Sequence, residues 1–555
     1  METKAYSVDK RLDHLLDTVV REVRLYAENQ ISQIKRLTQI GIALSAEKDV
    51  NSLLDIIVEE SRKITGADGG SLYIIDHTAK ILNFAILQND TLKTKCGGTS
   101  GIPIRLPPIP LEHDGRPNYA NVSSYVALTG QIVNIPDVYE SELFDFTGPR
   151  TYDISTGYRS RSMLVMPLKN HENDIIGVLQ LLNALDPETR ATIPFSDEYV
   201  ELIASLASQA AVALTNAQLI RDLQELFYSF IKSIATAIDA KSPYTGGHVR
   251  RVVDLTLMLA GGINETHDGP FADVHFSADE VEELRLAAWM HDVGKITTPE
   301  HVIDKSTKLE TIFDRIGHIE TRFDLIGQAI ENGYLRKKLE LHASNPTDRA
   351  HLDHLDRELA AELELLREEK LFIIACNKPG EFLPPEKVAR LNEIAGKSYA
   401  LNGEFHPYLR PDEVYHLSVL KGNLTAEERS LIENHAEMTM KILNELPFPK
   451  KYARVPEFAG SHHEKLDGSG YPRGLKGDSL SLQARIMAIA DVFEALTAKD
   501  RPYKAPMRLS QAIKILQFMT KDNHIDPDLY RLLLEKKLHR AYAERELNPE
   551  QIDEE

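Results

Sequence analysis

The sequence predicts a multidomain protein in which an α+β domain is followed by a long helix and a second, larger domain. With 555 residues the chain is too long for one ordinary domain. In the first 220 residues, the strand-like segments GGSLYIID, SMLVMPLKN and DIIGVLQLLNA alternate with polar turns and lie between helical segments, which predicts an α+β fold. In the second half, apolar helical runs carry histidine and aspartate at or near their ends.

A linking helix is predicted between the two domains, at about 219–240. Its apolar residues recur at steps of 3, 4, 3 and 4: Ile220, Leu223, Phe227, Phe230 and Ile234. This seam fits either a core helix of the second domain or a helix that pairs with its copy in a homodimer, and we favour the second interpretation. The amphipathic N-terminal helix, 1–34, would pair alongside it.

Composition and charge narrow the class of protein. The net charge of −20 argues against general nucleic-acid binding, so an anionic substrate would need a local basic site. No stretch of 18 or more apolar residues is present, and the N-terminus is too charged for a signal peptide. Cys96 and Cys376, far apart, make no disulfide framework. We expect a soluble, cytoplasmic protein without a membrane segment.

Seven histidines and aspartates of the second half form a set that a packed core has little reason to collect: His248, His291, Asp292, His435, His462, His463 and Asp491. His291 and Asp292 follow the apolar run LRLAAWM, so both are expected to be buried, which is costly unless they are hydrogen-bonded or bind a metal. On a continuing helix Lys295 would share a face with both.

Imidazole and carboxylate ligands without thiolate suit iron, manganese, zinc or nickel. Two metals about 3.5–4 Å apart are a familiar device for hydrolysing phosphate esters, because together they activate water and stabilise the developing charge. The seven residues therefore predict a two-metal centre that cleaves phosphodiesters.

The strings HDVGK (291–295), HHEKLDGSGYPRGL (462–475) and ADVFEALTAKDRPYK (490–504), with YTGGH (244–248) upstream, resemble the HD-GYP phosphodiesterases of the HD phosphohydrolase superfamily. The resemblance spans roughly 230–530. It implies an all-α domain with an iron centre that linearises cyclic di-GMP to pGpG, and in some members on to GMP. By motif position six residues are ligands, with Asp292 as the bridge: His248, His291, Asp292, His462, His463 and Asp491. Lys295, Arg501 and Lys504 would meet phosphate. The loop with Gly470 and Tyr471 would shape the substrate site or recruit signalling proteins.

The sequence departs from this family at three places. His435 follows the expected LTxEE segment but lies far beyond His291, so we infer a helical insertion at about 325–420; His318 competes for the role but lacks that lead-in. Tyr244 stands where some members have a carboxylate that holds a third metal, so two metals, iron or manganese, are expected. One extra residue precedes Arg501.

The N-terminal segments, in the order helix, GADGGSLYIID, RSMLVMPLKNHENDIIGVLQLLNA and SDEYVELIASLASQAAVALTNAQL, resemble a GAF domain over 35–218. Asn183, Phe195, Asp197 and Glu198 partly match the signature of nucleotide-binding GAF domains, although Ala184 replaces its lysine. A small-molecule or cyclic-nucleotide ligand and a ligand-free dimerisation scaffold remain equal alternatives.

The complete prediction is an N-terminal helix (1–34), a GAF sensor domain (35–218), a linking helix (219–240), an HD-GYP phosphohydrolase domain (241–535) and an acidic tail (536–555). The expected activity is hydrolysis of a cyclic dinucleotide, first of all cyclic di-GMP, regulated by the GAF domain. The alternatives are hydrolysis of another nucleotide such as cyclic GMP-AMP, or a non-catalytic sensor of cyclic dinucleotides that docks partner proteins.

Overall fold

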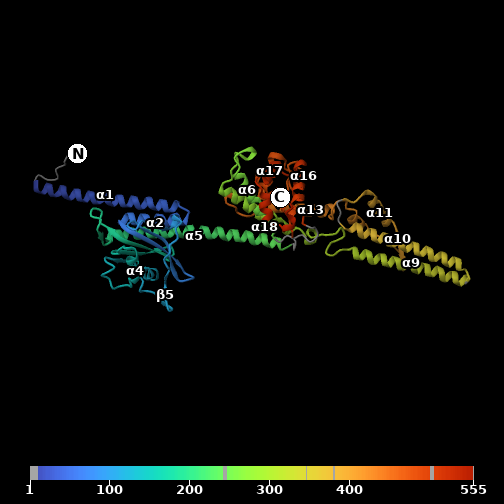
Figure 1. Ribbon diagram of the computed structural model, residues 1–555, viewed down its shortest axis with the longest axis horizontal. Helices are drawn as coiled ribbons and strands as arrows, with labels where there is room; N and C mark the ends of the chain where they lie inside the picture. Colours follow the sequence, from blue (N-terminus) through green and yellow to red (C-terminus); the bar gives the residue numbers. More distant parts are fainter. Residues whose placement is uncertain (1–9, 242–246, 346, 379–381, 500–505, 554–555) are drawn as a thin grey trace. The chain divides into compact units, whose positions relative to one another are not determined.

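The computed structural model describes residues 10–241, 247–345, 347–378, 382–499 and 506–553 (Figure 1). The chain forms two compact units, Met1–Leu226 and Phe227–Glu555. The first contains the expected α+β domain and the second is largely helical, so the predicted fold class is confirmed.

An antiparallel sheet in the order β3-β2-β1-β9-β8-β7 forms the centre of the first unit, with β10 paired to β9 and β4 to β2. Its strands are β1 (Ala67–Asp76), β2 (Ile81–Asn89), β3 (Thr94–Gly97), β4 (Ile109–Pro110), β7 (Val133–Ile135), β8 (Met163–Lys169), β9 (Ile175–Leu185) and β10 (Thr192–Ile193). A separate hairpin consists of β5 (Glu112–His113) and β6 (Arg116–Pro117). The central strands β1, β8 and β9 are almost entirely buried, because helices cover both faces of the sheet.

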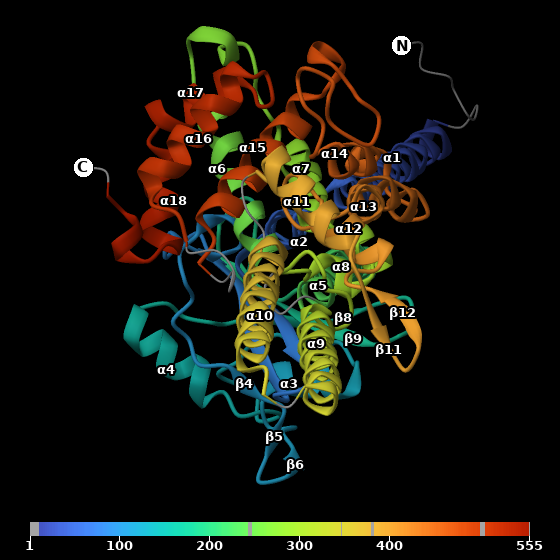
Figure 2. The ribbon, with the colours of Figure 1, turned by 90° about the vertical axis from the view of Figure 1, so that its right-hand side faces the viewer.

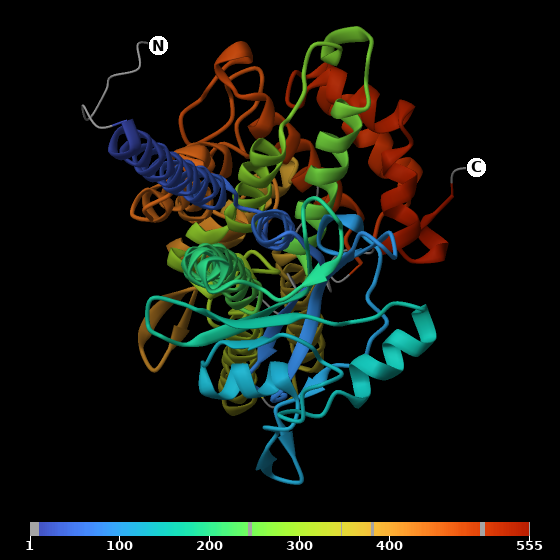
Figure 3. The same cartoon turned by 90° about the vertical axis from the view of Figure 1, so that its left-hand side faces the viewer.

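Helices α2 (Val50–Thr65) and α5 (Asp197–Asp239) lie on one face of this sheet and α3 (Val122–Thr129) on the other, as Figure 3 shows. The unit also contains α4 (Thr147–Thr156) and a short 3₁₀ turn, η1 (Gly98–Ser100). Asp49 caps the start of α2 and Gly66, in the left-handed region at φ 66°, ends it. α2 is thereby limited to the segment whose apolar face is buried on the sheet.

Helix α1 (Lys10–Ala46) packs only its C-terminal part into this core, through Leu37, Ile40 and Leu44. The expected linking helix is not a separate element, because α5 continues without interruption from the GAF core to Asp239. Among the five predicted seam residues, Ile220, Leu223 and Phe230 are exposed, whereas Phe227 and Ile234 pack against the core of the second unit. The predicted seam is therefore only partly packed: two of its five residues contact a core and three are exposed.

By length and composition, α5 is the one described helix that passes the test for a membrane span, and 39% of its most apolar window is buried in the protein core. A core helix of an ordinary domain passes the same test.

The second unit is built on helices around one large core. Its main elements are α6 (His248–Asn264), α7 (Ala278–Met290), α8 (Glu300–Ile303), α13 (Ala426–Asn444), α14 (Val455–Gly460), α15 (Leu482–Thr497), α16 (Leu509–Lys521), α17 (Pro527–Glu535) and α18 (Leu538–Glu546). Short 3₁₀ turns connect them: η2 (Gly269–Phe271), η3 (Val293–Thr297), η4 (Lys450–Tyr452), η5 (Gly477–Ser479) and η6 (Pro549–Gln551). The residues expected as an acidic tail instead form α18, whose Tyr542 and Ala543 are buried in this core.

The insertion has its own core and is larger than predicted. It comprises α9 (Ile316–Ser344), α10 (Arg349–Asn377), α11 (Pro385–Ala395), the hairpin β11 (Ser398–Leu401) and β12 (Glu404–Pro407), and α12 (Pro411–Leu417). Helices α9 and α10 lie antiparallel, side by side (Figure 2). Its buried residues begin at Leu309, before the expected start, and the β-hairpin was not anticipated. At its base, Nζ of Lys305 lies 2.8 Å from both carboxylate oxygens of Glu428 on α13.

Candidate metal centre

Five segments of the second unit bring the seven predicted ligands together. His248 begins α6, and His291 and Asp292 follow α7. His435 lies within α13, His462 and His463 follow α14, and Asp491 lies on α15. Residues separated by up to half of the chain therefore meet at one place.

The turn after α7 differs from the expected continuing helix. The α-helix ends at Met290, and Lys295 lies in the 3₁₀ turn η3. Its ammonium still reaches Asp292, with Nζ 2.6 Å from Oδ2, because three residues complete one 3₁₀ turn.

A close approach of two backbones places His435 beside this turn. A Cβ on Gly294 would lie only 1.9 Å from the carbonyl oxygen of His435, so only glycine allows α13 to come so near. Thr439 ties the two segments together: its hydroxyl accepts from the Gly294 amide at 3.0 Å and donates to the His291 carbonyl at 2.9 Å. The long insertion therefore returns α13 directly onto the HD turn.

The ligand atoms form two groups of three within which all atoms lie within 4.8 Å of one another: His248, His291 and Asp292, and His435, His462 and His463. Asp292 faces both groups. Its Oδ2 lies 3.4 Å from Nε2 of His291 and 3.6 Å from Nε2 of His248, while its Oδ1 lies 3.4 Å from Nε2 of His435. Asp491 also faces both, at 3.4 Å from His248 and 4.0 Å from His463.

The second ring nitrogen of three histidines is fixed by the backbone. In His291, Nδ1 lies 2.8 Å from the carbonyl oxygen of Ala288. In His435 and in His462, Nδ1 lies 2.5 Å from the carbonyl oxygen of the residue three positions earlier. The carbonyls accept from Nδ1–H, so each Nε2 is left with a free lone pair. These three Nε2 atoms and Oδ1 of Asp292 are buried and have no hydrogen-bond partner among the described residues. Burying such lone pairs without a partner is costly unless a cation binds them. Imidazole nitrogens and a carboxylate oxygen are ligands that suit divalent metals.

The electrostatic environment keeps most of the candidate ligands in the deprotonated state, which is the state that binds a cation. Burial lowers the pKa of His435 below its usual value. Burial also lowers the pKa of His463, to about 3. Burial together with the neighbouring His463 holds the pKa of His462 well below its usual value. Burial would raise the pKa of Asp292, but Lys295 and His291 hold it well below the ordinary range.

His248 and His291 have raised pKa values. Burial opposes protonation of both rings, but carboxylates outweigh it, chiefly Glu494 for His248 and Asp292 for His291. A cation at the same position competes with these protons, so metal binding here releases them.

The sequence reasoning missed a supporting carboxylate, Glu494. It is fully buried, contacts Nδ1 of His248 and accepts from Nε of Arg251 at 2.8 Å. Glu494 lies three residues after Asp491 on α15, and Arg251 three residues after His248 on α6. A search of the sequence for polar residues three or four positions from a predicted ligand could therefore have identified both Glu494 and Arg251.

The loop after the two adjacent histidines closes one side of the centre. The ring of Tyr471 lies 4.8 Å from that of His463 and 6.3 Å from that of His435. Gly470 is packed so tightly that a Cβ would lie 2.4 Å from the Lys465 amide nitrogen. Buried Glu464, which the sequence reasoning also missed, accepts from the amides of Arg473 and Leu475 and so shapes this loop.

Four positions considered in the sequence analysis lie away from the centre or outside the described residues. His318 is exposed on α9, in the insertion, while His435 is in the centre. Arg501, Lys504 and Tyr244 lie outside the described residues.

The four GAF signature residues do not meet at one place. Asn183 is buried at φ 54°, where its side chain accepts from the Arg161 amide and donates to Tyr158 and the Arg159 carbonyl. Phe195 is part of the apolar core. Asp197 and Glu198 are exposed in the first turn of α5, where Glu198 accepts from Gln33 on α1 at 3.0 Å.

Comparison with known proteins agrees with the two-unit architecture. Residues 49–214 match the GAF domain, and residues 245–375 and 407–529 match two families described as HD domain. The prediction of a GAF domain followed by an HD-type domain is confirmed. The second HD match begins inside the insertion, at the β12 hairpin strand.

Curated relatives match parts of the chain at moderate identity. A 3′3′-cGAMP-specific phosphodiesterase 3 of Vibrio cholerae is 37% identical over 158 residues, which are 27% of this chain and 33% of that protein. A probable cyclic di-GMP phosphodiesterase of the same organism is 42% identical over 116 residues, 19% of this chain and 25% of that protein. A cyclic di-GMP phosphodiesterase of Pseudomonas aeruginosa is 36% identical over 110 residues, 20% of this chain and 25% of that protein. The chain thus spans about a third or less of these relatives' length. The matches support a chain that combines a GAF domain with an HD-type region and is similar in part to these phosphodiesterases.

Proposed function

We propose that the chain hydrolyses a phosphodiester bond of a cyclic dinucleotide at the centre formed by its seven histidines and aspartates. The observation that carries this proposal is the position of Asp292, whose two carboxylate oxygens face two separate histidine groups. A shared carboxylate between two cation positions suits phosphate ester hydrolysis.

Two divalent cations, iron or manganese, would be held by His248, His291 and Asp292 and by His435, His462 and His463, with Asp491 beside both. When bound, they supply a water of lowered pKa and stabilise the charge that develops on phosphate. Imidazole and carboxylate donors without thiolate suit these metals.

The chain's own residues would bind and orient the phosphate. Lys295 is partly exposed beside Asp292, so its ammonium can approach an anionic oxygen and stabilise the negative charge that grows during reaction. Burial raises the pKa of Tyr471, so its phenol stays protonated and can donate a hydrogen bond. Gly470 permits the tight backbone that holds Tyr471 there. Arg501 and Lys504 are proposed as further phosphate contacts on the resemblance alone.

Cyclic di-GMP is the first candidate substrate, and 3′3′-cyclic GMP-AMP is the second. The second is favoured by three Vibrio cholerae relatives that are named for it, at 34–43% identity. The test is an anaerobic assay of manganese- or iron-loaded protein with both substrates, with the products separated by mass spectrometry and bound metal counted beforehand. Removal of metal by a chelator should abolish turnover, and added metal should restore it.

Each outcome of this assay is decisive. Linear pGpG from cyclic di-GMP supports the first substrate, and preferential opening of cyclic GMP-AMP supports the second. Two bound metals without turnover of either substrate contradict the proposal and favour the alternative, a non-catalytic sensor that docks partners through the loop around Tyr471.

We further propose that the chain is a cytoplasmic homodimer whose GAF domain, with a small-molecule ligand, regulates the centre through α5. Just beyond the C-terminal end of α5, the ammonium of Lys241 donates to three carbonyls of the turn after Asp292: those of Lys295 at 3.0 Å, Ile296 at 2.8 Å and Thr298 at 2.7 Å. A shift of this helix end would therefore move the turn that carries Lys295.

Lys241→Met in the full chain tests this link, because methionine keeps the length of the side chain but donates no hydrogen bond. Turnover should change while the bound metal count does not. If turnover and its response to added cyclic nucleotides are both unchanged, the proposed coupling through Lys241 is wrong.

A further inference from the structure

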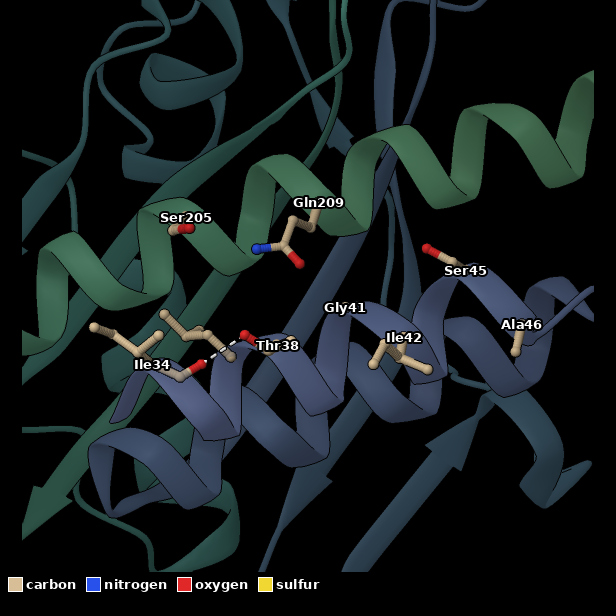
Figure 4. Close-up of a pocket in the computed structure, with 9 residues that line it drawn as sticks. Ile34, Thr38, Gly41, Ile42, Ser45, Ala46, Ser205 and Gln209 are labelled. Atoms are coloured by element: carbon tan, nitrogen blue, oxygen red, sulfur yellow. Dashed lines mark hydrogen bonds between the residues drawn. The ribbon is translucent and has the colours of Figure 1, made fainter. Parts of the chain in front are cut away.

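The hydroxyl of Thr439, in the middle of α13, leaves its own helix for its hydrogen bonds. A threonine within a helix commonly donates to the carbonyl four residues earlier. Thr38 on α1 does so, with Oγ1 2.9 Å from the carbonyl oxygen of Ile34 (Figure 4), and Thr497 on α15 makes the same kind of bond at 2.8 Å. Thr439 instead donates to the carbonyl of His291, so its hydroxyl joins two separate segments.

The two hydrogen bonds of this hydroxyl lie on either side of Asp292. The hydroxyl donates to the carbonyl of His291 at 2.9 Å and accepts from the amide of Gly294 at 3.0 Å. Thr439 is fully buried, so loss of its hydroxyl would leave the Gly294 amide in the core without a partner. The donor and the acceptor capacity of one side chain are therefore both used on the turn that carries the shared carboxylate.

The same contact determines where His435 lies. His435 precedes Thr439 by four residues, which places both on one face of α13. A Cβ on Gly294 would lie 1.9 Å from the carbonyl oxygen of His435 and 2.6 Å from the amide nitrogen of Thr439, so the two backbones touch here. Across this contact, Nε2 of His435 lies 3.4 Å from Oδ1 of Asp292.

The chain connection does not set this spacing. Gly294 and Thr439 are 145 positions apart, and the insertion with its own core lies between them. A second attachment of α13, the ion pair of Lys305 with Glu428, lies seven residues before His435, which is roughly 10 Å along the helix. The hydroxyl of Thr439 is only one turn from His435.

We infer that Thr439 is a positioning residue whose hydroxyl sets the distance between the Asp292 carboxylate and the histidine group that contains His435. The inference rests on the proposed two-cation centre and adds to it the residue that holds its two halves in register. Both hydrogen bonds of the hydroxyl end on backbone atoms, so Thr439 acts through the position of the turn and not as a ligand.

The two histidine groups should respond differently to loss of this hydroxyl. The group of His248 and His291 depends on α6 and on the turn after α7, and neither is held by α13. The group of His435 needs Asp292 from that turn and His435 from α13 at once. Loss of the hydroxyl should therefore weaken cation binding at the group of His435. Glu494→Gln, which loosens His248, should weaken binding at the other group.

The test is a titration of the metal-free full chain with manganese in competition with a chelating dye. The parent should give two affinities, and the one that remains in His435→Ala identifies the group of His248. Thr439→Val keeps the shape of the side chain and removes both hydrogen bonds. It should weaken the other affinity by about 10–100-fold and leave the affinity of the His248 group unchanged.

Two further variants separate positioning from a general effect on the core. Thr439→Ser keeps the hydroxyl and should restore both affinities to those of the parent. Thr256→Val on α6 is the matched control, because Thr256 is equally buried and its hydroxyl has no hydrogen-bond partner among the described residues. It should change neither affinity. Circular dichroism checks the fold, and Thr439→Ala, which removes the same hydroxyl, replaces Thr439→Val if the valine does not fit.

The outcomes distinguish this inference from the function on which it rests. A parent chain that binds fewer than two manganese ions contradicts the proposed centre itself. Two parent affinities that Thr439→Val leaves unchanged contradict the role of Thr439 and leave the centre standing. Equal weakening of both affinities, or no recovery in Thr439→Ser, also overturns the inference, because Thr439 would then support the core without setting the distance between the two groups.

Discussion

The metal centre and the GAF signature are both sets of polar residues recognised in the sequence, but their environments in the fold are opposite. In the centre, buried Nε2 atoms and a carboxylate oxygen point at one another without hydrogen-bond partners among the described residues. In the GAF domain, Asn183 and Glu198 are bonded to other parts of the protein, and Phe195 is core. Buried polar atoms without a hydrogen-bond partner indicate a site that can bind a ligand, whereas buried polar atoms with a partner indicate a structural role.

The largest effect is expected from Asp292→Asn, which keeps the volume of the side chain and removes its charge between the two histidine groups. Bound metal and turnover should be lost together, with turnover reduced roughly 10³-fold or more. Metal analysis and the assay on cyclic di-GMP measure both. Asp279→Asn, exposed on the same α7, is the control and should behave like the parent. Full metal content in Asp292→Asn would refute its role.

Lys295→Ala should keep the metals and reduce turnover by about 10²–10³-fold, because it removes a positioned charge rather than a ligand. Substrate affinity and maximal rate should be measured separately, alongside metal content. Lys441→Ala removes an exposed lysine of α13 and serves as the control. Metal loss in the Lys295 variant would mean that this residue supports the ligands instead.

Glu494→Gln should weaken metal affinity by about 10–100-fold, because the carboxylate orients His248 without touching metal. A competition titration with a chelating dye reports this affinity without substrate. Glu369→Gln in the insertion removes an equally buried carboxylate, bonded there to Lys397, and should leave affinity unchanged. Equal effects in the two variants would reduce Glu494 to a general contributor to stability.

The smallest effects are expected in the GAF domain. There, two residues of the signature, one buried and one exposed, should differ in their contribution to stability. Asn183→Ala should destabilise the domain by about 1–3 kcal/mol, because it leaves the Arg161 amide without its acceptor and removes one of the two hydrogen bonds of the Tyr158 hydroxyl. Glu198→Ala, at an exposed site, should change stability by no more than about 0.5 kcal/mol. Hydrogen exchange of β9 amides measures both.

In both GAF variants, turnover at the metal centre of the second unit should stay within about twofold of the parent. A cyclic nucleotide that protects β9 in the parent and not in Asn183→Ala would contradict the structural role and make Asn183 a ligand contact.

The ligand residues could be predicted from the sequence because their chemistry is local: the pairs His291-Asp292 and His462-His463 stand next to apolar helical segments. The supporting residues could not be ranked in this way. Glu494 resembles any other helical glutamate until α6 brings His248 against it, and Gly294 resembles any glycine until α13 packs on it.

The sequence by itself determined the order of domains, the candidate histidines and aspartates and the helical repeat of α5, because periodicity and residue chemistry are written along the chain. Tertiary structure decided which histidine joins the centre, since the insertion folds as its own core and returns α13 to the HD turn. It also decided which apolar residues of α5 are exposed. Phe227 and Ile234 are packed on the helical core while Leu219, Leu223 and Leu226 are not, and burial depends on neighbours that sequence periodicity does not specify.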